Sequence, residues 1–146
     1  MARELDHIAL ANRNHEALQH LLENAGRFPE WITTIAFYKA VQLVEASFSH
    51  TDVGNSSSHS DRLRTLEQEK AYHHIYKHYR PLWSASTIAR YLQDHENSRG
   101  YRCFTDFMKA EQVVSQLVNH RLKQIELSIT RSELLSAEAV RILEIL

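Results

Sequence analysis

The scarcity of residues that interrupt secondary structure constrains this chain most: only three glycines and two prolines occur in 146 residues. A β-sandwich needs many tight turns, which glycine and proline favour, so we expect long helices instead. The clearest helical pattern follows Pro29, a first-turn proline, and carries apolar side chains from Trp31 to Phe48. The sequence therefore predicts an all-α fold, an up-and-down bundle of four to five helices, in a single domain over residues 1–146.

Helix boundaries are expected where residues typical of helix ends occur. A first helix over about Arg3–Ala25, with Leu5 and Leu18 on its apolar face, is expected to stop at a left-handed Gly26. The second helix is expected to end near His50 and to be the most buried one. Residues 51–58, "TDVGNSSS", have the composition of a loop.

The second half of the chain predicts three more helical segments. Helical patterning resumes near Glu69 and runs to about Glu96, with Pro81 expected to kink or restart the helix. A cap at Thr105 predicts a helix of about 25 residues after it. The sequence "TRSE" at 130–133 fits a capping box and predicts a final helix through Leu146, apolar enough to need the core or another chain as its partner.

Composition narrows the classes of function. The formal net charge of −1 disfavours broad duplex nucleic-acid binding, which needs a basic excess, and leaves only a local patch or a surface shared between subunits. A single cysteine, Cys103, cannot form an internal disulfide, and we expect a packing thiol in a reducing environment. With no secretory signal and no membrane-length apolar run, the sequence predicts a cytoplasmic protein without a membrane partner.

The first candidate site is the pair His59 and Arg62, one helical turn apart at the start of a helix that Ser58 is expected to cap. A fixed positive charge lowers the pKa of a nearby histidine, which keeps it a neutral base. Arginine can hold a phosphate oxygen, so the two residues are the minimal set for metal-free cleavage of a phosphodiester. The alternative is a surface helix start in which both residues pair with Asp61 or Glu67.

The second candidate is a polar stripe in the segment "YRPLWSASTIARY". Tyr79, Ser86 and Arg90 share one helical face with Leu82 and Ala89. They predict a polar network between packed helices. Arg90 either has a functional role or meets a carboxylate or helix carbonyls in the core and fixes the register.

The third candidate is a histidine cluster. His74 and His78 have the spacing of two metal ligands on one helix face, and His73 adjoins them. No acidic or thiol side chain at matching spacing on that helix completes the site, although His59 or His50 could join from elsewhere. We therefore expect no metal and no other cofactor, with metal storage or sensing as a weaker alternative.

Together these stretches resemble the prokaryotic HEPN-like helical families. The resemblance rests on "FYKAVQLVEASFS", "SHSDRLRTL" and above all the stripe from Tyr79 to Tyr91, and it spans roughly Trp31 to Tyr91. It implies a helical bundle that often forms two-fold dimers and is linked to RNA cleavage, nucleotide binding, and toxin or defence systems. Many members of these families are non-catalytic binding modules.

The resemblance leaves two functions open. The Arg-x4–6-His ribonuclease signature fits loosely at Arg13–His20 and at Arg90–His95, but His59 and Arg62 are the polar pair at the matching helix start. In the first hypothesis, a homodimer brings together two copies of catalytic His59 and Arg62, and RNA or a nucleotide is bound by Asn55, Ser58 and Arg90. In the second, the chain is a non-catalytic module that dimerises or binds an antitoxin-like partner protein.

Overall fold

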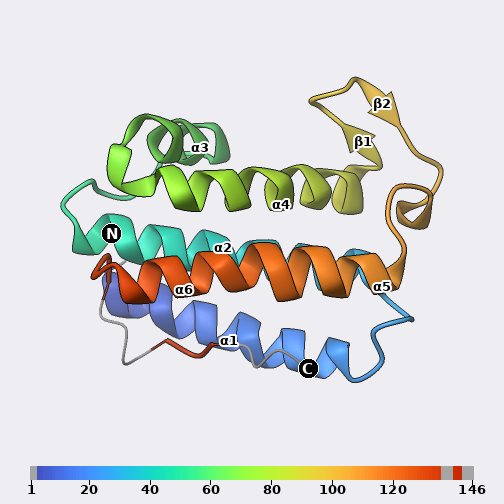
Figure 1. Ribbon diagram of the computed structural model, residues 1–146, viewed down its shortest axis with the longest axis horizontal. Helices are drawn as coiled ribbons and strands as arrows, with labels where there is room; N and C mark the ends of the chain where they lie inside the picture. Colours follow the sequence, from blue (N-terminus) through green and yellow to red (C-terminus); the bar gives the residue numbers. More distant parts are fainter. Residues whose placement is uncertain (1–2, 136–139, 143–146) are drawn as a thin grey trace.

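Four helical rods of alternating direction form the body of the protein in a computed structural model, which describes residues 3–135 and 140–142 (Figure 1). The rods are α1 (Glu4–Leu22), α2 (Pro29–His50), α4 (His73–Tyr91) and a continuous rod of α5 (Ala110–Gln112), η3 (Val113–Leu122) and α6 (Lys123–Arg131). The middle part of that last rod, η3, is π-helical. The prediction of an all-α, up-and-down bundle is confirmed.

Helix α2 lies at the centre of the bundle. Its side chains pack against α1 on one side and α4 and the α5–α6 rod on the others, and Phe37, Leu43 and Phe48 are fully buried. Pro29 begins it, as expected, because the missing N–H of proline costs nothing in the first turn. Trp31, predicted to join the apolar face, is instead 56% exposed, and Leu5 on α1 is also exposed.

A short layer covers one end of α4. Helix α3 (His59–Gln68) and the turn η1 (Lys70–Tyr72) pack on the N-terminal half of α4 and bury Leu66 and Tyr72 (Figure 1). The Tyr72 hydroxyl lies 2.7 Å from Ser47 Oγ and 2.8 Å from Thr51 Oγ1, so this layer is tied to the C-terminal end of α2.

The end of α4 differs from the prediction. The helix runs through Pro81 without interruption but stops at Tyr91, not near Glu96, because Leu92 takes a left-handed conformation (φ 57°). A small antiparallel hairpin of β1 (Gln93–Asp94) and β2 (Arg99–Gly100) follows where a helix end and a loop were expected. The Asp94 carboxylate accepts hydrogen bonds from the amides of Glu96 and Asn97, which stabilises the hairpin turn in place of another helical turn.

Two predicted helix caps are wrong. Gly26 is not left-handed, and α1 has already ended at Leu22. Thr105 lies in the single turn η2 (Phe104–Asp106), and the rod begins only at Ala110, where the Gln112 side chain accepts from the Lys109 amide at 3.1 Å.

The expected C-terminal helix and the buried thiol also require correction. Thr130 lies inside α6, where its hydroxyl donates to the Glu126 carbonyl at 2.8 Å, so it does not cap a new helix. Residues 132–135 and 140–142 are not helical, and the rest of the predicted helix lies outside the described residues. Cys103 is exposed, not packed in the core.

Candidate functional site

The start of α3 places the predicted pair. The Ser58 hydroxyl accepts a hydrogen bond from the Asp61 amide at 3.0 Å, so the predicted cap is present. Asp61 in turn accepts from the amide and hydroxyl of Ser57 at 3.0 and 3.3 Å. These contacts fix the first turn, and His59 and Arg62 project from it on one face.

Arg62 is buried rather than solvated. It is 7% exposed, and its guanidinium lies 3.5 Å from the carboxylate of Glu45 on α2, which is buried as well. Neither Asp61 nor Glu67, the partners considered from sequence, takes this place; Asp61 pairs with Arg64. Arg62 therefore joins α3 to the core helix, and its charge is compensated within the chain.

The bond between Arg62 and His59 determines the tautomer of the imidazole. Arg62 Nη1 donates to His59 Nδ1 at 2.8 Å, and guanidinium has no acceptor, so Nδ1 must carry the lone pair. The pKa of His59 is lowered by burial and by the positive charges of Arg62 and Arg90, as the sequence predicted in direction. At neutral pH the remaining proton of this half-buried ring is on Nε2, which is a donor and not a base.

The loop before α3 is anchored to the same ion pair. The Glu45 carboxylate accepts from the amide and hydroxyl of Ser56 at 2.9 and 3.1 Å. Asn55, predicted to bind substrate, instead accepts from the Ser49 hydroxyl at 2.9 Å through its side-chain oxygen. Ser56 is thus the loop residue that contacts the Glu45–Arg62 ion pair. The sequence of residues 55–58, one amide and three hydroxyl side chains, did not indicate which of them would make this contact.

Arg90, near the end of α4, is hydrogen-bonded to Ser86 of its own helix and to Tyr38 of α2. Its Nε donates to the Ser86 carbonyl at 3.2 Å, and its two terminal nitrogens donate to Tyr38 Oη at 3.1 Å and Ser86 Oγ at 3.3 Å. The guanidinium also lies over the rings of Tyr38 and Tyr91, at 5.6 and 5.2 Å. Within the described residues no carboxylate is at ion-pair distance from Arg90, so its positive charge is not neutralised by a salt bridge.

Tyr79 and Tyr91, the outer members of the stripe, have opposite environments. Tyr79 is fully buried, and burial raises the pKa of its phenol to about 12. Tyr91 is 62% exposed at the end of α4. Only the inner part of the stripe, Ser86 and Arg90, forms the predicted polar network.

Phe37 brings the two candidate stretches together. Its ring centroid lies 5.7 Å from that of His59 and 5.6 Å from that of Tyr79, and the Arg90 guanidinium lies 5.6 Å above it. We call His59, Arg62, Arg90, Phe37 and Tyr38 the His59–Arg90 cluster. A hollow of about 220 Å³ adjoins Arg90 and is lined by Trp31, Ala89, Thr34 and the acidic Glu30.

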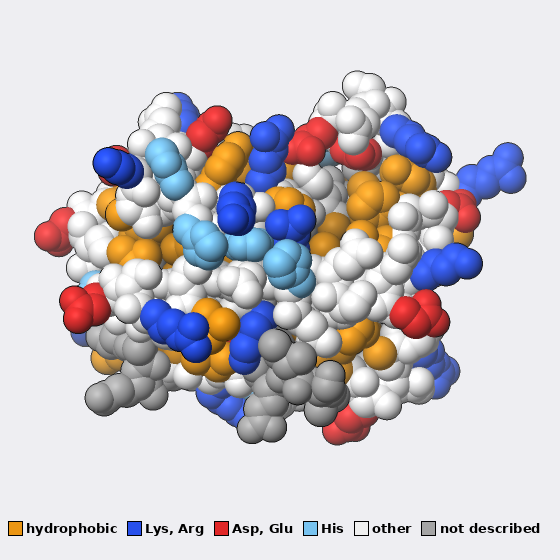
Figure 2. Space-filling model, viewed as in Figure 1, with side chains coloured by type: hydrophobic (Ala, Val, Ile, Leu, Met, Phe, Trp, Pro, Cys, Tyr) orange, Lys and Arg blue, Asp and Glu red, His pale blue; other side chains and the backbone are white. Residues whose placement is uncertain are grey.

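The histidine cluster places the buried His78 between two exposed histidines. The ring of His78 lies 5.2 Å from those of His74 and His120, and histidines gather at the centre of the face in Figure 2. Arg121 donates to His78 Nδ1 at 3.3 Å, and burial together with Arg121 lowers the pKa of His78 to about 4. Among residues 3–135 and 140–142, no group of three or more potential ligands is arranged to hold a metal ion.

A buried polar centre was missed by the sequence reasoning. Lys39 on α2 is fully buried and forms an ion pair with Glu126 on α6, and it donates to His15 Nδ1 on α1 at 2.9 Å. Helical spacing contained the signal, since Lys39 lies three and four residues from buried Ala36 and Leu43. The centre joins α1, α2 and α6 through these contacts.

Comparison with protein families, curated proteins and solved structures found no match to this chain. None of the described helices combines the length and apolar character needed to cross a lipid bilayer.

Proposed function

We propose that this protein is a HEPN-like helical module with an RNA-related role, and that the His59–Arg90 cluster binds a phosphate of single-stranded RNA or of a nucleotide. The observation that carries the proposal is the half-buried Arg90, whose charge has no salt-bridge partner among the described residues and which sits beside aromatic rings. Arginine with exposed rings is the combination that binds a phosphate and stacks an adjacent base.

The geometry favours binding over cleavage. A metal-independent ribonuclease would use His59 to take a proton from a 2′-hydroxyl, but Nδ1 is occupied by Arg62 and Nε2 carries a proton. Arg62 is engaged by Glu45 and is too buried to reach a phosphate directly. In this proposal, Arg62 positions His59, and His59 Nε2–H and Arg90 donate to the phosphate.

The aromatic side chains supply the contact with a base. Trp31 lines the hollow beside Arg90 and is 56% exposed, and Tyr91, whose ring lies 5.2 Å from the guanidinium, is 62% exposed. Glu30 in the same hollow repels phosphate, so the phosphate is expected on the His59 side of Arg90 and the base on the Trp31 side. Two such clusters in a homodimer would double the positive charge that the chain's net charge of −1 conceals.

Fluorescence anisotropy with a labelled single-stranded RNA, at low and at moderate salt, tests the proposal. We expect Arg90→Gln to weaken binding roughly tenfold and to make it less sensitive to salt, since one phosphate contact is lost. Trp31→Ala should weaken binding by one stacking contact, about 1–3 kcal/mol. Arg64→Gln, which removes an exposed arginine of α3, and Leu10→Ala, which removes an exposed apolar side chain of α1, are the matched controls.

A cleavage assay in the presence of a metal chelator separates binding from catalysis. The RNA should remain intact with the wild-type protein. Cleavage that disappears in His59→Gln while circular dichroism stays unchanged would establish the ribonuclease hypothesis instead. RNA affinity equal in wild type, Arg90→Gln and Trp31→Ala would contradict a role of the cluster in binding.

A second candidate is a non-catalytic module that binds a protein partner or a second copy of itself. Three large exposed aromatics, Phe28, Trp31 and Tyr91, favour it, because aromatic side chains are enriched at interfaces. Sedimentation of the wild type and of the Trp31→Ala/Tyr91→Ala double variant distinguishes the two functions. A dimer that dissociates in the double variant, together with no RNA binding in either protein, would favour the interaction module.

A further inference from the structure

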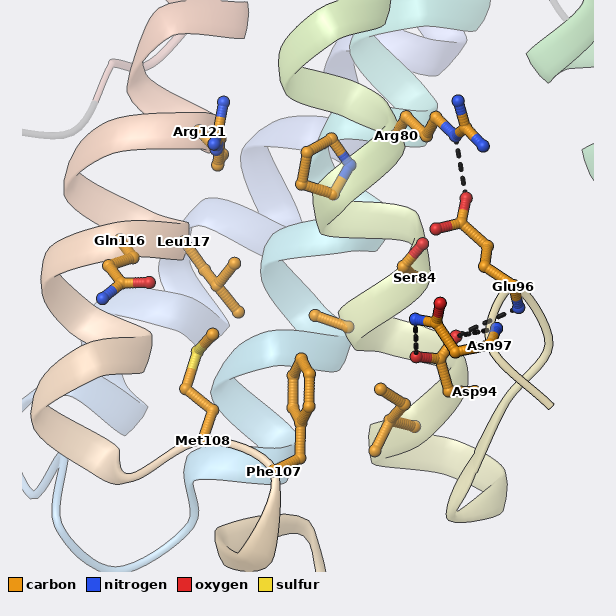
Figure 3. A pocket seen from close by; sticks show the side chains of 13 residues that line it. Arg80, Ser84, Asp94, Glu96, Asn97, Phe107, Met108, Gln116, Leu117 and Arg121 are labelled. Carbon is orange, nitrogen blue, oxygen red and sulfur yellow. Dashed lines mark hydrogen bonds and ion pairs between the residues drawn. The ribbon is translucent and has the colours of Figure 1, made fainter. Parts of the chain in front are cut away.

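A second hollow lies on the opposite face of α4 from Arg90. It has a volume of about 470 Å³ and is enclosed by α4, the β1–β2 hairpin, the segment after η2 and the α5–α6 rod (Figure 3). Ser84 and Ile88 of α4 line it, each two residues before Ser86 and Arg90 of the first site. Because successive helical residues are about 100° apart, two residues turn the side chain to the far side of the helix. The two sites are therefore separate.

One wall of this cavity is apolar. Phe107 and Met108 rise from its base, and Leu117 projects from the rod toward them (Figure 3). Pro81, Ala85 and Ile88 of α4 complete the apolar lining. A cavity of this volume and lining accommodates the body of a small organic molecule, because ligand pockets are mostly apolar with a few polar groups.

The two arginines of the cavity differ in charge balance. Arg80 Nε is bonded to the carboxylate of Glu96 at 2.8 Å, so its charge is neutralised (Figure 3). Arg121, on the rod, has no ion-pair partner within the described residues. The Arg121 guanidinium donates a hydrogen bond to His78, an imidazole that is neutral at pH 7 because burial and Arg121 lower its pKa to about 4.

The remaining polar groups of the cavity lie on α4 and on the hairpin. The Asp94 carboxylate is occupied by the hairpin, since Asn97 Nδ2 donates to it at 2.7 Å in addition to two backbone amides. Negative charge is thus concentrated at the hairpin wall and unneutralised positive charge at the rod wall. Ser84 Oγ is buried beside the cavity and has no hydrogen-bond partner within the described part of the chain.

We propose that this cavity binds a small organic anion, with an apolar or aromatic body against Phe107, Met108 and Leu117 and a single carboxylate or phosphate at Arg121. The size of the hollow, its apolar base and the uncompensated charge of Arg121 together define this class. The site is independent of the His59–Arg90 cluster and of any activity there.

Three probes with the same aromatic body test the class of ligand: 1-naphthylacetate, 1-naphthyl phosphate and the neutral 1-naphthylacetamide. Calorimetric titration of the full chain should show that at least one anion binds ten times or more tightly than the amide. The anion with the higher affinity identifies the preferred head group, carboxylate or phosphate. The proposal is overturned if neither anion binds at millimolar concentration, or if the anions and the amide bind with equal affinity. Both results are obtained with the wild-type protein alone.

Variants then locate the site. Arg121→Gln should reduce the affinity for the anion about tenfold and leave the affinity for the amide unchanged, whereas Arg131→Gln, which removes an exposed arginine of the same rod, should change neither. Ser84→Leu fills the cavity and should abolish binding of all three probes. Circular dichroism and RNA binding, both expected to be unchanged, show that the fold and the first site are intact. Undiminished anion binding in Arg121→Gln or Ser84→Leu overturns the assignment.

Discussion

Lys39 and Glu126 form an ion pair inside the bundle, with both side chains fully excluded from solvent. The same ammonium donates to His15 Nδ1 at 2.9 Å and to the Arg141 carbonyl at 2.9 Å, so its three donors are all used. Helices α1, α2 and α6 and the C-terminal segment thus meet at one nitrogen. Burial lowers the pKa of Lys39, and the Glu126 carboxylate opposes that shift and keeps the ammonium charged.

Breaking this ion pair is expected to destabilise the fold severely. Lys39→Met removes the cation that faces the buried Glu126 carboxylate, and breaking a buried ion pair from one side costs about 3–5 kcal/mol of the free energy of unfolding. The double variant Lys39→Met/Glu126→Met removes both charges, so it should cost clearly less than the sum of the two single variants. Urea denaturation followed by circular dichroism measures all three, with Lys77→Met on the exposed surface of α4 as the control. A single variant that costs no more than this control would contradict the structural role of the pair.

Stability is expected to fall on acidification through two buried histidines. Burial and nearby cations lower the pKa of His15 and of His78 to about 4, from an ordinary value of 6.5. The unfolded chain therefore takes up protons below about pH 6.5 that the folded chain does not accept until about pH 4, and folding stability decreases across this window. His78→Gln should flatten the dependence of the unfolding midpoint on pH between 6.5 and 4, and His73→Gln, at an exposed position of the same helix, is the comparison variant.

The N-cap of α3 can be tested in isolation. Ser58→Ala removes the hydroxyl that accepts from the Asp61 amide and should cost about 1 kcal/mol of the free energy of unfolding. Ser60→Ala, two residues later on the exposed surface of the same turn, is the matched control and should be neutral or slightly stabilising, because alanine is the better helix former. Equal effects of the two substitutions would show that the cap contributes nothing.

Local signals in the sequence were sufficient for the long helices and for the cap at Ser58. The apolar spacing after Pro29 and the loop composition of residues 51–58 involve neighbours in the chain, and the structure follows them. Helix ends that depend on tertiary packing were misplaced. Nothing near Leu92 in sequence favours a left-handed residue, and the hairpin that follows is held by Asp94 bonds that spacing does not reveal.

The sequence was sufficient to name most residues of the site, but not to predict which of them contact one another. Helical spacing placed Ser86 and Arg90 on one face, and charge alone gave the direction of the His59 pKa. The partner of Arg62 is Glu45, 17 positions earlier in the chain, and the packing of α3 on α4 brings the two side chains together. Whether a polar residue is a solvated base or a buried positioning group depends on such long-range partners, and helical spacing does not contain them.

Two glycines make a matched pair for testing backbone strain. Gly54 has a positive φ of 86°, whereas Gly26 does not, and a Cβ added at either would meet no atom within 4 Å. Gly54→Ala should therefore cost about 1 kcal/mol through conformational strain alone. Gly26→Ala should be neutral or stabilising by up to about 1 kcal/mol, since it reduces the entropy of the unfolded chain. Thermal unfolding should give a lowered midpoint for Gly54→Ala and an unchanged or raised midpoint for Gly26→Ala, and a lowered midpoint for both would contradict the assigned conformations.

The tautomer of His59 decides between binding and base catalysis. Because Arg62 donates to Nδ1, nitrogen-detected or long-range proton–nitrogen NMR at pH 7 should show a single neutral tautomer with the proton on Nε2. His73, which is exposed, provides the comparison signal in the same spectrum. In Glu45→Gln/Arg62→Met, which removes both charges of the buried ion pair, the pKa of His59 should rise toward 6.5 and the tautomer preference should weaken. A proton on Nδ1 in the wild-type protein would free Nε2 to act as a base, and the ribonuclease hypothesis would then be favoured over the binding role.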